Sequence, residues 1–201
     1  MEIVLTDDNR ILIWPLAALI LLMGISWRRK RGFSYFLCAA VFGVYLLVAV
    51  NIAFFPIQIG GSYAEQMRQV AFAPFINLAP FNFNLSEMPE LVWKQIFQNI
   101  LLTVPFGFGI NFLVSIRARR IFWLALAVGV GIEAIQLLIS LLLRYPYRVI
   151  DINDAILNTS GVFIGYGLFR LFAWLYLWAT RRLRIEHGGL TAYVYDVARR
   201  A

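Results

Sequence analysis

The sequence predicts an all-α fold, a polytopic membrane helix bundle of about five transmembrane helices, with the N-terminus outside and the C-terminus cytoplasmic. Three observations predict it: the composition, five long apolar stretches and the placement of the basic residues. Of the 201 residues, 61% are apolar and 14% are charged, whereas globular chains average about 45–50% apolar and about 25% charged. Disorder is excluded by this composition, and an intrachain disulfide is excluded because Cys38 is the single cysteine.

Five stretches are long enough to span a bilayer, which takes roughly 20 mainly apolar residues. They are residues 11–27, 33–55, 96–116, 121–143 and 152–179. Arginine-rich clusters follow the first, third and fifth of them, and Lys and Arg accumulate in cytoplasmic loops. All three clusters fall on one face when the N-terminus is outside. This grouping at helix ends fits membrane flanks, so the net charge of +7 is not taken as a sign of nucleic-acid binding.

The first stretch is expected to be a retained helix, because a signal peptide would carry its basic residues before the apolar region and not after it. The long connection 56–95 combines prolines with many aromatic residues, including Phe72, Phe75 and Phe83. Aromatic residues favour the membrane interface, and proline interrupts helices. We expect an outer interfacial or shallow re-entrant segment that caps the bundle above a cavity.

Polar residues in the last two stretches form two helical stripes. Glu133 and Gln136 are three residues apart and share one face near the bilayer midplane. In the last stretch, the residues at alternating spacings of three and four are Asp151, Asp154, Asn158, Gly161 and Gly165. Gly161 and Gly165 form a small-residue pair that permits close helix packing. We expect these two helices to pack along their stripes, with glycine making room for Glu133.

A polar pocket open to the outside is the functional hypothesis, because an intramembrane acid is expensive unless it is paired, wetted or protonated. Its candidate ligand-binding residues are Asn99, Glu133, Gln136, Arg148, Asp151, Asp154 and Asn158.

Structural roles compete with this hypothesis at several positions. Asp151 and Asp154 fit the N-cap and third position of a capping box. Asn99 or Asn158 alone could act as interhelical glue. Arg148 could anchor anionic headgroups or pair with Glu133.

Four sequence blocks resemble the VanZ-like family of bacterial membrane proteins. The first is Asn77-Leu78-Ala79-Pro80-Phe81, and the second is the helix that begins at Asn99 and contains Pro105-Phe106-Gly107. The third is the pair Glu133 and Gln136. The fourth is formed by Arg148, Asp151, Asp154, Asn158, Gly161 and Gly165.

The resemblance covers about residues 35–180 and implies a multi-pass protein of the bacterial inner or plasma membrane. It also implies a role in the cell envelope, since founding members are linked to low-level resistance to the lipoglycopeptide teicoplanin. The chain then divides into an N-terminal helix with a basic loop (1–32), a VanZ-like membrane domain (33–180) and a cytoplasmic tail (181–201).

Three functions are compatible with these residues. The favoured one is binding of an amphiphile, either the antibiotic or a lipid-linked wall precursor, with Arg148 for a phosphate or carboxylate and the aromatic residues of 72–83 for the tail. The alternative is a phosphoryl or glycosyl transferase or hydrolase with Glu133, Asp151 and Asp154 as catalytic candidates. A proton-coupled transporter is the third. The expected partners are membrane lipids and the amphiphile, not nucleic acid, and no cofactor or metal is expected.

Overall fold

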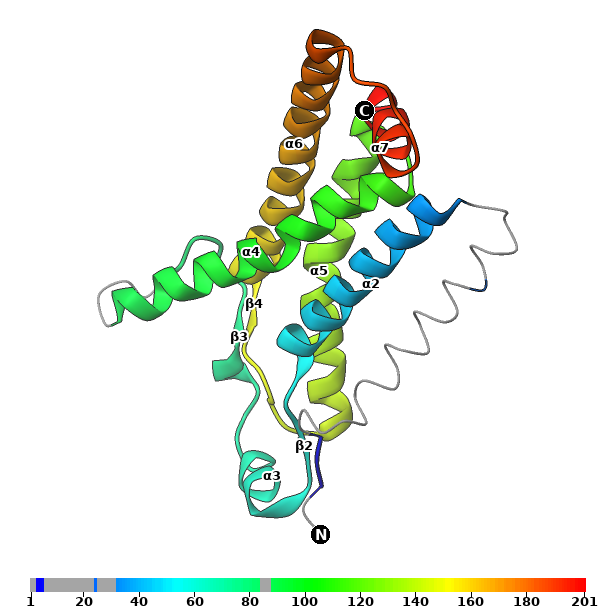
Figure 1. Cartoon of the computed structure of the whole chain (residues 1–201). Coiled ribbons are helices and arrows are strands. Elements are labelled where there is room, and N and C mark those ends of the chain that lie inside the picture. The colour runs from blue at the N-terminus through cyan, green and yellow to red at the C-terminus, as the bar shows by residue number, and fades with distance from the viewer. Residues whose placement is uncertain (1–2, 6–23, 25–31, 84–87) are drawn as a thin grey trace.

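The computed structural model describes residues 3–5, 24, 32–83 and 88–201. Four helices are long and apolar enough to cross a membrane: α2 (Phe33–Phe54), α4 (Pro89–Leu113), α5 (Ala118–Leu143) and α6 (Ile152–Leu183). Two shorter helices are α3 (Gly61–Met67) and α7 (Leu190–Arg199). The predicted all-α membrane bundle is confirmed (Figure 1). The first predicted helix, 11–27, lies outside the described residues except for Gly24, so the full number of crossings and their orientation stay predictions.

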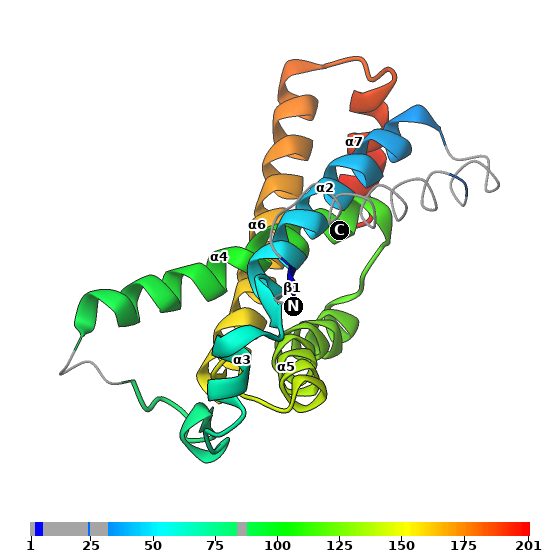
Figure 2. The ribbon, with the colours of Figure 1, turned by 90° about the horizontal axis from the view of Figure 1, so that it is seen from below.

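The predicted helix 96–116 differs most from its observed counterpart, because α4 begins seven residues earlier, at Pro89. The start carries ordinary signals: proline in the first turn, where its missing N–H costs nothing, and the acid Glu90 near the positive helix end. Polar residues within 89–95 interrupt the apolar run, so hydropathy did not identify this segment as part of the helix. The N-terminal half of α4 extends away from the other helices in two perpendicular views (Figures 1 and 2).

The connection 56–95 contains more regular structure than the sequence suggested. Strand β2 (Ile57–Ile59) pairs antiparallel with β1 (Ile3–Leu5), and α3 follows it. A 3-10 turn at Ala73–Phe75 leads into β3 (Ile76–Asn77), which runs parallel to β4 (Ile150–Asp151). The expectation that proline prevents a regular helix holds only for the later part, since α3 lies in the long interval between Pro56 and Pro74. The β3–β4 pair brings this connection to the beginning of α6.

Glycines determine how α6 packs, and the predicted partner helix was wrong. A Cβ at Gly161 would overlap the side-chain oxygen of Thr103, and one at Gly165 would overlap the carbonyl oxygen of Val104. Both neighbours belong to α4, whereas we expected Gly161 to face Glu133 on α5.

The contact is reciprocal, because a Cβ at Gly107 of α4 would overlap the carbonyl oxygen of Val162. At the contact between α5 and α6 the close approach depends on Gly129 of α5, where a Cβ would overlap the carbonyl oxygen of Ala155 and the hydroxyl oxygen of Thr159. Close backbone approach of this kind is what small residues permit in membranes.

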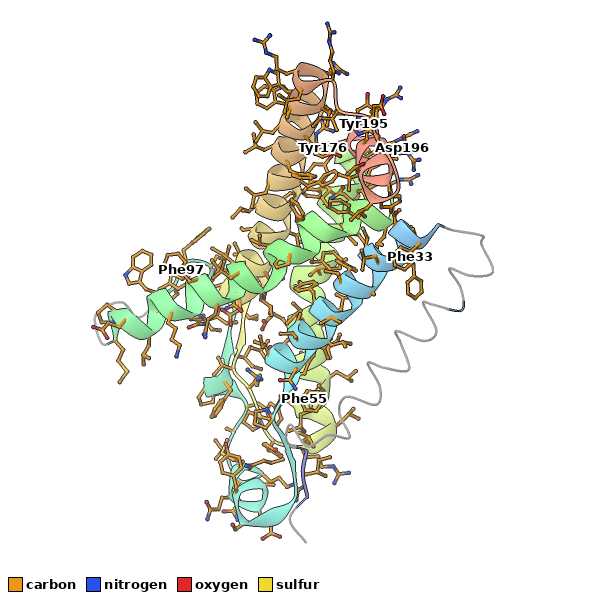
Figure 3. The ribbon with its side chains drawn as sticks, in the orientation of Figure 1. Phe33, Phe55, Phe97, Tyr176, Tyr195 and Asp196 are labelled. Carbon is orange, nitrogen blue, oxygen red and sulfur yellow. The ribbon has the colours of Figure 1, made fainter. Side chains whose placement is uncertain are left out.

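The C-terminal segment forms the amphipathic helix α7, which packs against the far end of α6. The ring of His187 stacks on Tyr195 with centroids 4.2 Å apart, and Tyr176 of α6 lies 6.4 Å from His187. Figure 3 shows Tyr176 and Tyr195 at the same end of the molecule. The Tyr193 hydroxyl donates to the carbonyl of Phe112, so α7 is also tied to the end of α4.

Candidate functional site

One polar cavity, with a volume of about 420 Å³, lies where α2, α4, α5 and the start of α6 meet. Its lining consists of Ile52, Ala53, Gln95, Gln98, Asn99, Leu102, Ile132, Glu133, Gln136, Arg148, Val149 and Asp154. Five of the seven residues predicted for the pocket are among them, namely Asn99, Glu133, Gln136, Arg148 and Asp154. Three separate spanning helices therefore contribute polar side chains to a single space.

Asp151 is the N-cap of α6, as the capping interpretation predicted. Its side chain accepts a hydrogen bond of 2.8 Å from the backbone N–H of Asn153. The Nδ2 atom of Asn153, at 2.8 Å, and that of Asn77, at 3.2 Å, also donate to this carboxylate. With these partners Asp151 holds β3 and β4 together at the helix start, and it does not belong to the cavity lining in the described part of the chain.

Glu133 completes the cap from another helix. In a capping box the residue three positions after the cap accepts a hydrogen bond from the backbone N–H of the cap residue. Here the backbone N–H of the cap residue Asp151 donates instead to Oε2 of Glu133, which lies on α5, at 3.0 Å. A buried carboxyl group of α5 is thereby fixed against the first turn of α6, where the helix dipole favours an acceptor.

Asp154 therefore does not make the capping-box hydrogen bond that its position, three residues after Asp151, suggested, because Glu133 makes it. Its Oδ1 accepts a 2.8 Å hydrogen bond from Nε2 of Gln95, and both residues line the cavity. The carboxyl group is half-buried and points toward α4 instead of back to the cap. Among the acids considered, Asp154 is therefore the one best placed to meet a ligand.

Arg148 and Gln136 bind the end of α2. The last carbonyl groups of a helix have no partner within it. Arg148 donates to the carbonyls of Phe55 at 2.9 Å and Ile52 at 3.3 Å, and Gln136 donates to that of Ala53 at 2.8 Å. The alternative considered from the sequence, an ion pair between Arg148 and Glu133, is not among the contacts of the described residues: Arg148 binds these carbonyls, and Glu133 binds the N–H of Asp151. The guanidinium is thus engaged with backbone, although it still borders the cavity.

Asn158 does not join the cavity lining in the described residues. It is 1% exposed, and its backbone carbonyl accepts a 2.6 Å hydrogen bond from the hydroxyl of Thr103 on α4. Its side-chain amide atoms are buried without a hydrogen-bond partner among the described residues. Its place is in the α4–α6 interface.

Four polar residues of the site were missed as site residues. Gln95 and Gln98 share a face of α4 with Asn99, but Gln95 lies before the predicted helix start at residue 96 and joins this face only because α4 begins at Pro89. Asn153 is 1% exposed and joins the connection to α6, because it accepts from the N–H of Phe81 at 2.5 Å and donates to the carbonyl of Ala79 at 3.3 Å. Asn77 was noticed within a sequence block, yet nothing local indicated its contact with Asp151.

The cavity is rich in hydrogen-bond acceptors. Glu133 and Asp154 contribute two carboxyl groups, and three side-chain amides of α4 contribute carbonyl oxygens. Among the described residues of the lining, Arg148 is the one cationic group, and its Nη2 atom already donates to backbone carbonyls. Such a site is suited to a polar group that donates hydrogen bonds or carries positive charge.

Comparison with known proteins identifies the family. The family model described as VanZ/LLP1 matches residues 42–173, a range that contains every residue of the cavity lining. No curated protein and no solved structure shows a significant match to the chain. The match extends over more than half of the sequence and agrees with the four motif blocks and the apolar helices, so the chain belongs to the VanZ/LLP1 family.

Proposed function

We propose that this VanZ-like envelope membrane protein binds an amphiphile whose polar head enters the cavity between α2, α4, α5 and α6. The observation that carries the proposal is the convergence of polar side chains from three spanning helices on one space of about 420 Å³. Ligand pockets in proteins commonly have volumes of about 300–1,000 Å³. Burying polar side chains in a membrane protein is costly, and such residues commonly mark functional sites.

The head group is expected to donate hydrogen bonds. Asp154 has a side-chain partner in Gln95, which leaves acceptor capacity on its carboxyl group. Asn99 and Gln98 add amides that can both donate and accept. Hydroxyl, amide and amine groups fit this environment, whereas an anionic head would meet two carboxyl groups and one guanidinium whose Nη2 atom already donates to backbone carbonyls. This refines the expectation from sequence that Arg148 binds an anion.

Resistance to teicoplanin-type lipoglycopeptides is the cellular role that we propose, by analogy with the founding members of the family. The ligand would be the antibiotic itself or a lipid-linked wall precursor, since both join a hydroxyl- and amide-rich head to a hydrocarbon chain. Binding would occur in the bacterial inner or plasma membrane, from its outer leaflet.

Native mass spectrometry of gently purified protein, together with teicoplanin susceptibility of cells that express it, tests the proposal. We expect a co-purified amphiphile with the wild type and a strongly reduced amount with Asp154→Asn or Asn99→Leu. Glu65→Gln is the matched control, because Glu65 is an exposed acid of α3 away from the cavity. The proposal is wrong if no amphiphile accompanies the wild type and susceptibility is the same for all variants.

A membrane-embedded hydrolase or transferase is the second candidate, favoured by the presence of Glu133 and Asp154 on one cavity. General acid–base catalysis requires a carboxyl group that can exchange a proton with the substrate. With an enzyme, Asp154→Asn would abolish turnover of a lipid-linked precursor while the amphiphile still co-purifies. With a binding protein, the same variant loses the amphiphile, and no product accumulates with the wild type.

A further inference from the structure

A second cavity, about 780 Å³ in volume, lies between α2, α4, α6 and α7. We call it the apolar groove. Its walls are formed almost entirely by hydrocarbon side chains, among them Leu37 and Val41 of α2 and Leu168, Leu171 and Phe172 of α6. Leu190 and Val194 of α7 border it as well. Three of these helices, α2, α4 and α6, are apolar enough to span a membrane, and a groove with this lining is suited to a hydrocarbon chain and not to a polar ligand.

The apolar groove and the polar cavity lie along the same stripe of α4. Residues three or four apart share a helix face. Gln98 and Leu102 line the polar cavity, and the stripe continues through Pro105, Gly109 and Phe112, which line the groove. The distance along this stripe is about 21 Å at 1.5 Å per residue.

Helix α2 repeats the arrangement. Ile52 borders the polar cavity, and Tyr45, Phe42 and Cys38 on the same face border the groove. The two helices touch along these stripes, since a Cβ at Gly109 would lie 2.7 Å from the ring of Phe42. At the junction the hydroxyl of Tyr45, a groove residue, donates to the carbonyl of Leu102, a cavity residue, at 2.7 Å. The two spaces are therefore neighbours along one helix pair.

We propose that the apolar groove holds the hydrocarbon chain of the same amphiphile whose head enters the polar cavity. This inference rests on the proposed function and specifies its ligand as a single molecule with a donor-bearing head and a long chain. The hydrocarbon chain of the ligand is then expected to contact α2, α4, α6 and α7, and not the aromatic residues of the connection 72–83 as the sequence suggested. That connection is held at the start of α6 by Asn77 and Asn153, and its Phe81 is 74% exposed.

Photolabelling tests the inference. The probe is dodecylamine with a diazirine at the end of its chain, added to the purified full-length protein in lipid nanodiscs, with unlabelled dodecylamine as competitor. Labelled positions are read by peptide mass spectrometry. We expect labelling in the groove that saturates and is competed. Dodecyl sulfate with the same diazirine should label the groove without saturation, because its head cannot donate hydrogen bonds to the cavity.

Variants separate the head from the chain. Asp154→Asn removes a charged acceptor and should raise the half-saturating concentration about tenfold, the equivalent of one charge-assisted hydrogen bond. Leu171→Trp, or Val41→Trp on the opposite wall, fills the groove and should abolish competed labelling there. Val130→Trp is the matched control, because Val130 is 47% exposed on α5 and does not line the groove. Thermal unfolding of each variant establishes that it is folded.

The possible results distinguish the two proposals. Competed labelling that depends on Asp154 but maps to residues 72–83 would overturn the groove assignment and leave the proposed function intact. Groove labelling that is equal for amine and sulfate, and unaffected by Asp154→Asn, would also overturn it, since the chain site would be independent of the polar cavity. Absence of competed labelling anywhere would contradict both proposals.

Discussion

Replacing Gly165 by alanine tests whether glycine sets the approach of α6 to α4. A Cβ at this position would overlap the carbonyl oxygen of Val104 and lie 2.9 Å from the backbone nitrogen of Phe108. Both are backbone atoms of a packed helix, so neither can move aside as a flexible side chain could. Gly167, on the same helix, has no heavy atom of the described residues within 4 Å of the position that its Cβ would take, its own helix backbone aside.

The size of the effect follows from two opposing contributions. Alanine stabilises a helix interior by about 1 kcal/mol relative to glycine. Adding atoms to a packed interface costs about 1–3 kcal/mol. Gly167→Ala should show only the first contribution, whereas Gly165→Ala should be destabilised by the second. The first contribution is common to both variants because both glycines lie inside α6, so we expect a difference of about 1–3 kcal/mol in unfolding free energy between them.

Reversible unfolding in mixed detergent micelles, followed by circular dichroism, measures this difference. Gly131→Ala on α5 is a second control, because the described residues leave the space at its Cβ empty too, apart from its own helix backbone. Equal stability of the Gly165 and Gly167 variants would refute the conclusion that this glycine is required by the α4–α6 contact.

Three further predictions concern the groups that hold the connections to the bundle. Asp151→Ala should cost about 0.5–2 kcal/mol in thermal unfolding through loss of the α6 cap, and Asp151→Asn should cost less; equal losses would contradict the capping role. Arg148→Lys should speed hydrogen exchange in the last turn of α2, because a lysine cannot reproduce the two contacts of the guanidinium with the carbonyls there; unchanged exchange would show that those contacts contribute nothing. Burial raises the pKa of Tyr145 above its ordinary 10.0, and its hydroxyl donates to the carbonyl of Gln58 at 2.5 Å. Folding therefore disfavours the phenolate, so stability should decline above about pH 10 in the wild type and decline less in Tyr145→Phe, as measured by chemical denaturation across pH.

The membrane helices could be predicted closely from the sequence. The predicted stretches 33–55, 121–143 and 152–179 agree with α2, α5 and α6 to within a few residues at each end. The thickness of the bilayer sets the required apolar length, so composition alone locates such helices. The start of helix α4 was located less well, because Glu90, Lys94 and Gln95 interrupt its apolar run before residue 96.

The polar residues could be found from the sequence, but their partners could not. Helical spacing shows which side chains share a face, and it correctly grouped Glu133 with Gln136. It says nothing about the rotation of one helix against another, and so it directed Gly161 to α5 when the contact is with α4.

By itself, the sequence determined that the chain is a VanZ-like membrane bundle with acids and amides inside its helices, because hydrophobic length and residue spacing are local properties. Only the tertiary structure decided what those groups do. Glu133 binds the backbone of Asp151, and Arg148 binds the end of α2, so Asp154 is left to face the cavity. The physical reason is that unpaired backbone groups at helix ends compete for the same side chains as a ligand, and only the packed arrangement shows which of them come within reach.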